Sequence, residues 1–214
     1  MKKYICAIIA LTAVLSSAVQ TTADGEYAWA KDAVDFCSAA GILMGNESGD
    51  FMLGDHVTQA QTAAFLSRSY VTDNSNELSV SLVEKSHWAS DQVKKISGYI
   101  VLPGAFNPDA PATREMFIST LCNIIGMQNG SPVVLENDFT DIGDVTPDYV
   151  PMLAAAYEAG LLRGSDGRIN PSDALTRAEA VTFIHRAMKF TGFLARLPRA
   201  NIMRLQKLRN ISPR

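Results

Sequence analysis

One pattern occurs three times in this chain of 214 residues and constrains the fold more than any other feature of the sequence. Each time, an apolar residue is followed seven positions later by a threonine that precedes a run with helical periodicity. The pairs are Phe51 and Thr58, Phe106 and Thr113, and Ile169 and Thr176. Equal offsets at a period of roughly sixty residues indicate an internal repeat, so we expect like units to pack together into one core.

Each repeat is predicted to be helical on both sides of an extended hook. In the third repeat, apolar residues from Tyr149 to Tyr157 fall on one helical face, which ends at Gly160. Glycine is a common residue just beyond a helix end. Asp166-Gly167 predicts a tight turn, and Pro171 favours an extended approach to the next helix.

The second helix of each repeat begins with a capping motif. In Thr176-x-x-Glu179 the hydroxyl accepts a hydrogen bond from the first turn, and the carboxylate accepts one from the backbone of the cap residue. Thr58-x-x-Gln61 preserves this box. The second repeat has methionine at the box position and its glutamate one residue early, at Glu115, so it should lose half of the cap.

The residue that follows each threonine differs between the repeats and is Gln59, Arg114 or Arg177. Because the cap uses only the first and fourth positions of the motif, we expect the Arg177 side chain to be free. Arg177→Ala should then leave the melting temperature nearly unchanged. Gln59 carries no charge, so the first repeat looks structurally sound but functionally weakened. The alternative for both arginines is a solvated side chain or an ion pair within the protein.

At these residues the chain resembles the S-layer homology family. Units of that family carry an aromatic residue near the start, a G-[IL]-x-x-G turn, an F-x-P hook and a T-R-A-E helix start. The third repeat matches best, with the runs Gly160-Leu161-Leu162-Arg163-Gly164 and Thr176-Arg177-Ala178-Glu179. The resemblance covers residues 24–188, and three units are usual for the family.

The resemblance implies an all-α fold, a pseudo-threefold bundle of three helix-loop-helix units with grooves between neighbouring units. It also implies noncovalent attachment to the bacterial cell wall, through anionic, often pyruvylated, secondary polysaccharide held in those grooves. The expected division of the chain is a signal peptide (1–23), three units (24–72, 82–128 and 138–188) and a basic C-terminal tail (189–214).

Seven residues are candidate contacts to this polysaccharide: Arg177, Arg114, Gln59, Trp29, Trp88, Gly164 and Gly45. A helix N-terminus has unpaired N–H groups and about half a positive charge, which suits a carboxylate. An arginine at the same place adds a planar fork that can grip the carboxylate twice. We therefore expect Arg177 to matter most for binding, Arg114 less and Gln59 least.

The aromatic and glycine candidates also have structural alternatives. Trp29, Trp88 and Tyr149 take equivalent places in the repeats and could stack on sugar rings, but a place in the core at the start of the first helix is favoured. Gly45 and Gly164 are expected to serve the geometry of the turn, although glycine also lets a ligand approach the backbone.

The charge is distributed unevenly along the chain. All 22 acidic residues lie between residues 24 and 188 beside ten Lys or Arg, so this segment has a net charge of −12. Such an acidic body argues against nucleic acid as the main partner. The tail from residue 189 has seven basic residues and no acid, and it is either a poorly ordered end or a contact to anionic surfaces.

The N-terminus has the layout of an export signal. Met1-Lys2-Lys3 precedes an apolar run from Tyr4 to Leu15 that is too short to span a bilayer. We therefore expect a secreted protein at the cell wall or cell surface, without a transmembrane helix. Cys37 and Cys122 could form one disulfide there, although two buried thiols in separate helices are favoured.

Nothing in the sequence predicts an enzyme, a metal site or a cofactor. His56, His87 and His185 lack the spacing of metal ligands, and G-x-S-x-G, H-E-x-x-H and phosphate-loop motifs do not occur. The expected function is cell-wall binding. The alternative is an exported structural or adaptor protein whose degenerate units contact other exported or S-layer proteins.

Overall fold

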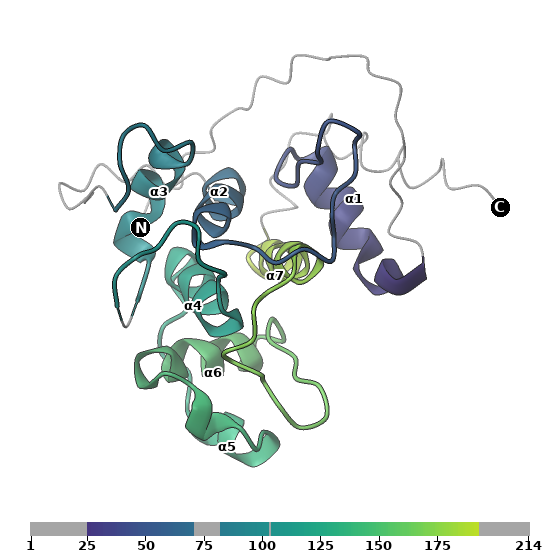
Figure 1. Cartoon of the computed structure of the whole chain (residues 1–214). Helices are drawn as coiled ribbons and strands as arrows, with labels where there is room; N and C mark the ends of the chain where they lie inside the picture. Colours follow the sequence, from purple (N-terminus) through teal and green to yellow (C-terminus); the bar gives the residue numbers. More distant parts are fainter. Residues whose placement is uncertain (1–24, 71–81, 103, 193–214) are drawn as a thin grey trace.

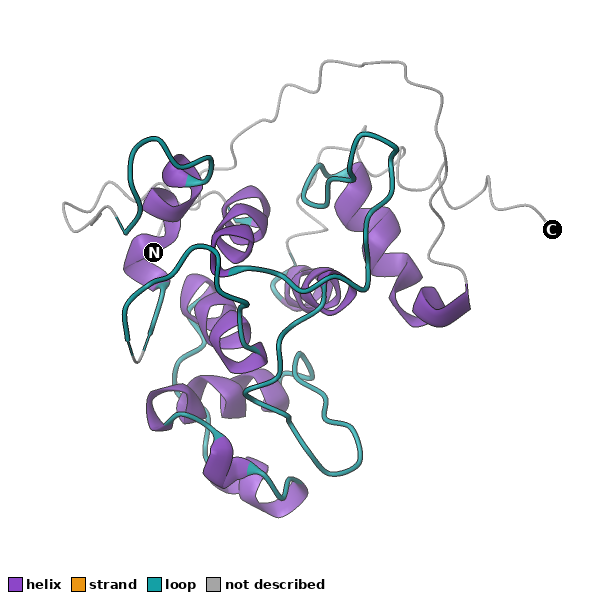
Figure 2. Ribbon diagram, viewed as in Figure 1, coloured by secondary structure: helices purple, strands orange, loops and turns teal. Residues whose placement is uncertain are grey.

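The computed structural model describes residues 25–70, 82–102 and 104–192. Over these residues the chain is helical and contains no β-strand, which confirms the expected all-α class (Figure 2). The predicted signal peptide and the tail beyond residue 192 lie outside the described residues.

The described α-helices are α1 (Lys31–Ala39), α2 (Gln59–Ser69), α3 (Ser90–Ile96), α4 (Arg114–Ile125), α5 (Val133–Asp138), α6 (Val150–Glu158) and α7 (Arg177–Phe190). The short 3-10 helices are η1 (Gly25–Ala30), η2 (Ser97–Tyr99), η3 (Ile142–Asp144) and η4 (Pro147–Tyr149). Figure 1 shows α2, α4 and α7 nearest the middle of the molecule, with α1, α3 and α6 around them. We call α2, α4 and α7 the central helices.

Each central helix packs against the first helix of another repeat. Helix α2 packs on α3, α4 packs on α6, and α7 at the end of the chain packs on α1 at its beginning. The helices of one repeat are therefore not each other's main partners, and the last repeat closes onto the first.

The segments that lead into the central helices form a closed cycle of backbone hydrogen bonds. The N–H of Val57 donates to the carbonyl of Leu175 (2.8 Å), that of Leu175 to Ala112 (3.0 Å), and that of Ala112 back to Val57 (2.8 Å). This cycle joins all three repeats at one place. The symmetry of the bundle as a whole stays a prediction.

The first two N–H groups of each central helix bind carbonyls in the hook of another repeat. The N–H groups of Gln59 and Ala60 donate to Ala110 and Pro108, those of Arg114 and Glu115 to Asp173 and Pro171, and those of Arg177 and Ala178 to Asp55 and Leu53, at 2.9–3.0 Å. A helix start normally leaves these donors without a partner in the helix. Here they hold the repeats together.

The cap residues account for the next donor at each helix start. Complete capping boxes are present at Thr176 with Glu179 and at Thr58 with Gln61, as predicted. In the second repeat the Thr113 hydroxyl accepts from the backbone of Met116, and half of the box is missing, also as predicted. These donors are therefore satisfied within the protein at all three helix starts.

The misplaced glutamate of the second repeat has a structural role of its own. The Glu115 side chain is buried and accepts hydrogen bonds from the backbone (2.9 Å) and the hydroxyl (2.8 Å) of Thr146. Thr146 leads into η4 of the third repeat. Glu115 therefore caps a turn in the neighbouring repeat instead of its own helix.

The turns of the third repeat follow the sequence signals. Gly160 has φ +70° just past α6, and Asp166 and Gly167 have φ +52° and +69° in the predicted tight turn. The carboxylate of Asp141, which is 1% exposed, accepts hydrogen bonds from the backbone of Ile169 and Asn170. It thereby fixes the hook that follows the turn.

Both cysteines of the described chain are buried and unpaired, Cys37 in α1 and Cys122 in α4. The favoured interpretation of two buried thiols in separate helices is confirmed. Burial raises the pKa of both thiols, to about 12 for Cys122, so neither is activated as a nucleophile.

We expect Thr176→Ala to lower the free energy of unfolding by about 0.5–2 kcal/mol, because the substitution removes both hydroxyl contacts of the capping box. Chemical denaturation monitored by circular dichroism measures this change. Ser131→Ala, at an exposed position before α5, is the control and should stay within about 0.5 kcal/mol of the parent protein. Equal stability of the two variants would contradict the assigned cap.

Candidate functional site

The Arg177 side chain is held inside the protein. It is 7% exposed, and its Nε and Nη2 donate to the carbonyls of Phe51 (2.8 Å) and Met44 (2.7 Å). Its guanidinium lies over the ring of Phe65, 5.3 Å from the centroid. The expectation of a free side chain is wrong, because α7 begins directly against the hook of the first repeat and the arginine extends into that interface.

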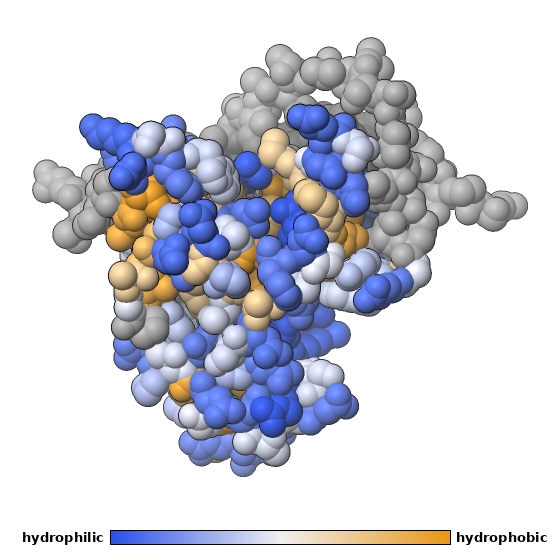
Figure 3. Space-filling model, viewed as in Figure 1, coloured by the Kyte–Doolittle hydropathy of each residue, from blue (hydrophilic) through white to orange (hydrophobic). Residues whose placement is uncertain are grey.

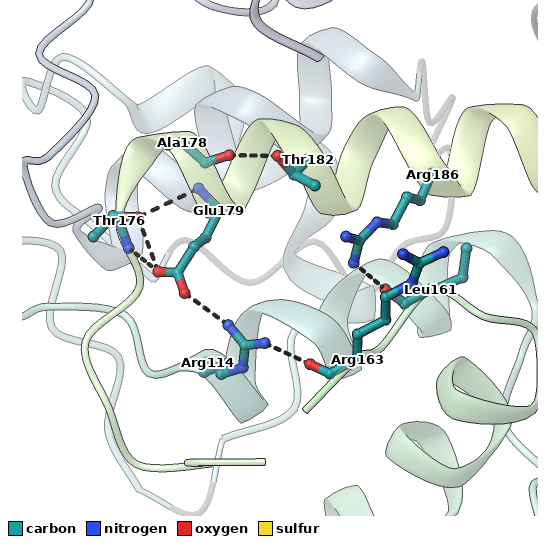
Figure 4. Close-up of polar contacts among 8 residues, drawn as sticks. All are labelled: Arg114, Leu161, Arg163, Thr176, Ala178, Glu179, Thr182 and Arg186. Atoms are coloured by element: carbon teal, nitrogen blue, oxygen red, sulfur yellow. Dashed lines mark hydrogen bonds and ion pairs between the residues drawn. The ribbon is translucent and has the colours of Figure 1, made fainter. Parts of the chain in front are cut away.

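Arg114 makes the corresponding contacts between the second and third repeats (Figure 4). Its Nη1 forms an ion pair with Oε1 of Glu179 (2.9 Å), and its Nη2 donates to the carbonyl of Arg163 (3.0 Å). Its guanidinium lies over Phe183 at 5.0 Å. The alternative of an ion pair within the protein is confirmed for Arg114. Burial lowers the pKa of Arg114, and Glu179 opposes that shift.

Gln59 takes the same place at the remaining interface. Its Oε1 accepts a hydrogen bond from the backbone of Asn107 (3.1 Å), in the hook of the second repeat. All three residues that follow the cap threonines therefore bind a loop of another repeat. Because the backbone donors beside them are also occupied, the expectation of unpaired N–H groups at these helix starts is wrong.

A second set of polar side chains was not found by sequence reasoning. Ten positions after each cap threonine, a side-chain nitrogen donates to the carbonyl that follows the first glycine of the turn motif. The pairs are Arg68 with Ile42 (3.3 Å), Asn123 with Tyr99 (2.9 Å) and Arg186 with Leu161 (3.1 Å). The equal offset of ten residues from each cap threonine could have revealed this set in the sequence.

The two sets together clamp the turn loops of the first and third repeats. In the first repeat, Arg68 holds Ile42 while Arg177 holds Met44, two residues further on. In the third repeat, Arg186 and Arg114 hold Leu161 and Arg163 in the same manner (Figure 4). Each loop is thus fixed from its own repeat and from another.

The interface between the first and second repeats lacks this arrangement at every position. Gln59 stands where the others have arginine, Asn123 replaces the second arginine, and Thr120 stands in the place of Phe65 and Phe183. The hydroxyl of Thr120 is buried and has no hydrogen-bond partner among the described residues. The three replacements coincide at one interface. Both the arginine and the ring beneath its guanidinium, which pair at the other two interfaces, are absent there.

The two tryptophans are exposed, so the favoured core interpretation is wrong for them. Trp29 is 56% exposed and Trp88 is 58% exposed, whereas Tyr149 is buried and its hydroxyl donates to the carbonyl of Val101. Tyr149 is the N-cap of α6, the place that Ala30 and Ala89 hold in the other repeats.

Trp29 and Trp88 lie one residue before the position that corresponds to Tyr149, and this offset explains their exposure. Each tryptophan directly precedes the N-cap residue of its first helix, and that position faces solvent. The N-cap residue of each first helix is buried instead. The tryptophans and Tyr149 are therefore not equivalent.

The two candidate glycines are required by close packing. A Cβ on Gly45 would lie 2.9 Å from the carbonyl oxygen of Asp50, and one on Gly164 would lie 2.2 Å from the ring of Phe139. Neither glycine has a positive φ. Close contacts within the protein therefore explain why both positions are glycine.

The histidines do not gather. His56 is exposed, Nδ1 of His87 accepts from the backbone of Ala89, and His185 stacks on Phe36 with centroids 5.2 Å apart. Burial, assisted by Lys189, lowers the pKa of His185 to about 4. In the described part of the chain, no group of three His, Cys, Asp or Glu side chains could hold a metal ion.

The surface of the described residues mixes hydrophilic and apolar areas (Figure 3). Among its hollows are two open ones of about 370 Å³ each. One is lined by Leu82, Val83, Glu84, Ser86, His87 and Pro108, and the other by Gly126, Met127, Gln128, Asn129, Ala155, Glu158, Ala159 and Phe190. Neither hollow is lined by an arginine or a tryptophan.

Among residues 25–70, 82–102 and 104–192, no helix has the length and apolar character needed to cross a membrane.

Comparison with known proteins identifies one segment of the chain. The family model described as S-layer homology domain matches residues 138–181. That segment holds the clamped loop of the third repeat and the start of α7 with its complete capping box. The matched domain is a non-catalytic anchoring domain, so it indicates no enzymatic role for the chain.

Three curated relatives match about half of the chain at 25% identity. They are an exoglucanase XynX of Acetivibrio thermocellus (109 residues, 48% of this chain), an amylopullulanase of Thermoanaerobacterium thermosulfurigenes (109 residues, 48%) and an endo-1,4-beta-xylanase A of Thermoanaerobacterium saccharolyticum (101 residues, 44%). The matches cover 10%, 6% and 8% of those proteins. The chain thus spans at most a tenth of each of these relatives.

We expect Arg177→Ala to lower the free energy of unfolding by about 1–3 kcal/mol, because it removes a buried side chain that donates two hydrogen bonds to carbonyls in a partly buried interface. Urea denaturation measures the change. The control is Lys94→Ala, which removes an exposed cation from α3 and should stay within about 0.5 kcal/mol of the parent protein. If Arg177→Ala were as stable as the parent protein, the buried role of this side chain would be refuted.

Proposed function

We propose that this chain, which carries an S-layer homology domain at residues 138–181, attaches noncovalently to the bacterial cell wall by binding anionic, pyruvylated secondary polysaccharide. The family match supports attachment to the wall in general. The chemistry of the exposed and half-buried side chains supports a glycan as the ligand.

The observation that carries this proposal is the exposure of two tryptophans at matching places. Trp29 and Trp88 stand directly before the N-caps of α1 and α3, and each exposes more than half of its surface. A large aromatic side chain exposed at the same place on two repeats offers a flat apolar face to a ligand. A sugar ring offers a flat C–H face that suits an indole.

An arginine side chain would bind the anionic group of the glycan. A carboxylate accepts two hydrogen bonds from one guanidinium fork, which gives both strength and orientation. Arg114 is half-buried, whereas Arg177 is buried with 7% of the residue exposed. We therefore assign the ligand contact to Arg114, and the role of holding repeats together to Arg177 and Gln59.

The loops that the arginines clamp would shape the binding surface. Gly45 and Gly164 end the clamped turns and keep the chain compact there, so the loops present backbone instead of side chains to a ligand. Secretion and a place at the cell wall follow from this function. The protein needs no catalytic residue, metal or cofactor for it.

Sedimentation with purified sacculi tests the proposal. We expect the protein to be retained on complete walls and lost from walls stripped of secondary polysaccharide. Replacing both Trp29 and Trp88 by alanine should weaken retention about two- to tenfold, because each indole contributes a stacking contact. Phe190→Ala, which removes a similarly exposed ring at the end of α7, is the control and should have no effect.

Two outcomes would contradict this function. Equal retention on complete and stripped walls would point to peptidoglycan or protein as the partner. Retention on neither would favour the adaptor alternative, in which the repeats contact another exported protein.

A further inference from the structure

The contact between α1 and α7 joins the first repeat to the last (Figure 1). Across it, the thiol of Cys37 donates to the carbonyl of Val181 (3.7 Å), and the ring of Phe36 stacks on His185 with the centroids 5.2 Å apart. Among the residues that the structure describes, no ion pair crosses this contact. Packing of buried side chains therefore holds the two helices together.

His185 places a basic side chain inside this contact. The residue is 8% exposed, and its ring lies nearly parallel to that of Phe36, at an interplanar angle of 25°. In the described part of the chain, no carboxylate forms an ion pair with it. A neutral imidazole packs here as an aromatic ring, whereas a protonated one would be a buried cation without a paired anion, which is costly.

The charges nearest to His185 also disfavour its protonation. Burial, as the largest cause, and the cations Lys189 and Arg186 together lower the pKa of His185 to about 4. Lys189 follows it by four positions on α7, and Arg186 by one. Asp32 of α1 opposes the shift, but the residue is exposed and does not reach ion-pair distance. The packed contact thus keeps the imidazole neutral at acidic pH.

The remaining charged groups on the elements around α7 have other partners or are exposed. Lys31 and Asp35 of α1 pair with each other (3.4 Å). In α2 and α4, Arg68 binds a turn loop, Arg114 pairs with Glu179, and Glu115 binds Thr146. Glu26 in η1 is exposed. The tyrosines and thiols of these elements are neutral at acidic pH, so none of them supplies a counter-ion.

A detached α1 would not compete as a separate helix. It has nine residues, and isolated helices shorter than about 12–15 residues are marginal in water. Its release would uncover His185, whose pKa then returns to the ordinary value of 6.5. Above that pH the ring is neutral in both states. As the pH falls from 6.5 towards 4, only the detached state binds a proton, so acid favours detachment.

We propose that the contact between α1 and α7 is an acid-sensitive switch, in which protonation of His185 releases α1 while the three helix starts stay joined through the hooks. The start of α7 is bound to carbonyls of Asp55 and Leu53, eight positions before His185, and these bonds do not involve α1. Release of α1 uncovers the ring of Phe36. It also frees Trp29, which directly precedes the N-cap of α1.

Hydrogen exchange of the full chain at pH 8 and pH 5 tests this switch, with each rate divided by the intrinsic rate at that pH. Protection of the α1 amides should fall about ten- to thirtyfold at pH 5, the factor by which a proton bound with a pKa of 6.5 favours the detached state. Protection in α4 and α6, which pack on each other, should change less than about threefold.

Two variants remove the titrating group. His185→Phe keeps a ring to stack on Phe36, and His185→Gln is the smaller alternative if phenylalanine does not fit. Neither side chain binds a proton, so the protection of α1 at the two pH values should agree within about twofold. The matched control is His56→Gln, which removes an exposed histidine and should keep the loss seen in the parent protein.

Three results would overturn the proposal. The first is equal protection of α1 at both pH values in the parent protein. The second is a loss that persists in His185→Phe and His185→Gln. The third is a loss shared equally by α1 and α4, because it would show global unfolding in place of the release of one helix.

Discussion

The fold depends on where the backbone donors at the start of each central helix find their acceptors. The first two N–H groups of α2, α4 and α7 donate to hook carbonyls of another repeat, and a third backbone hydrogen bond links the segments just before the caps. An unpaired buried donor is costly, so the neighbouring hook stabilises each helix start in the folded protein. The helix starts thus couple the stability of the three repeats.

Side chains of the central helices add further hydrogen bonds to those of the backbone. Two arginines from different repeats bind the turn loop of the first repeat (Arg68 and Arg177), and two others bind that of the third repeat (Arg186 and Arg114). Arginine suits this place because its several donors can bind carbonyls while its flat face lies on a ring. The loops that a ligand would meet are consequently held by the same contacts that join the repeats.

Much of the local structure could be predicted from the sequence, because it depends on neighbours in the chain. The capping boxes at Thr58 and Thr176, the half cap at Thr113 and the turn at Asp166-Gly167 all rest on residues within a few positions. The all-α class follows from the same short-range periodicity.

The site was harder to predict because its partners are distant in the sequence. Arg177 lies against Phe51 and Met44, 126 and 133 positions away, and nothing near Arg177 in the chain reveals that its side chain is buried. The sequence favours a core position for the tryptophans, but they lie one residue before the position of Tyr149, and that shift changes which side faces solvent. The spacing of the repeats does not distinguish positions one residue apart.

Hydrogen exchange of the intact protein tests the interlocked arrangement most directly. The backbone amides at the first two positions of α2, α4 and α7 belong to Gln59, Ala60, Arg114, Glu115, Arg177 and Ala178. At an ordinary helix start such amides exchange rapidly, because no carbonyl within the helix binds them. Here we predict that all six exchange only through global unfolding, with the same free energy as the slowest core amides. Rapid exchange at any of the three helix starts would contradict the account.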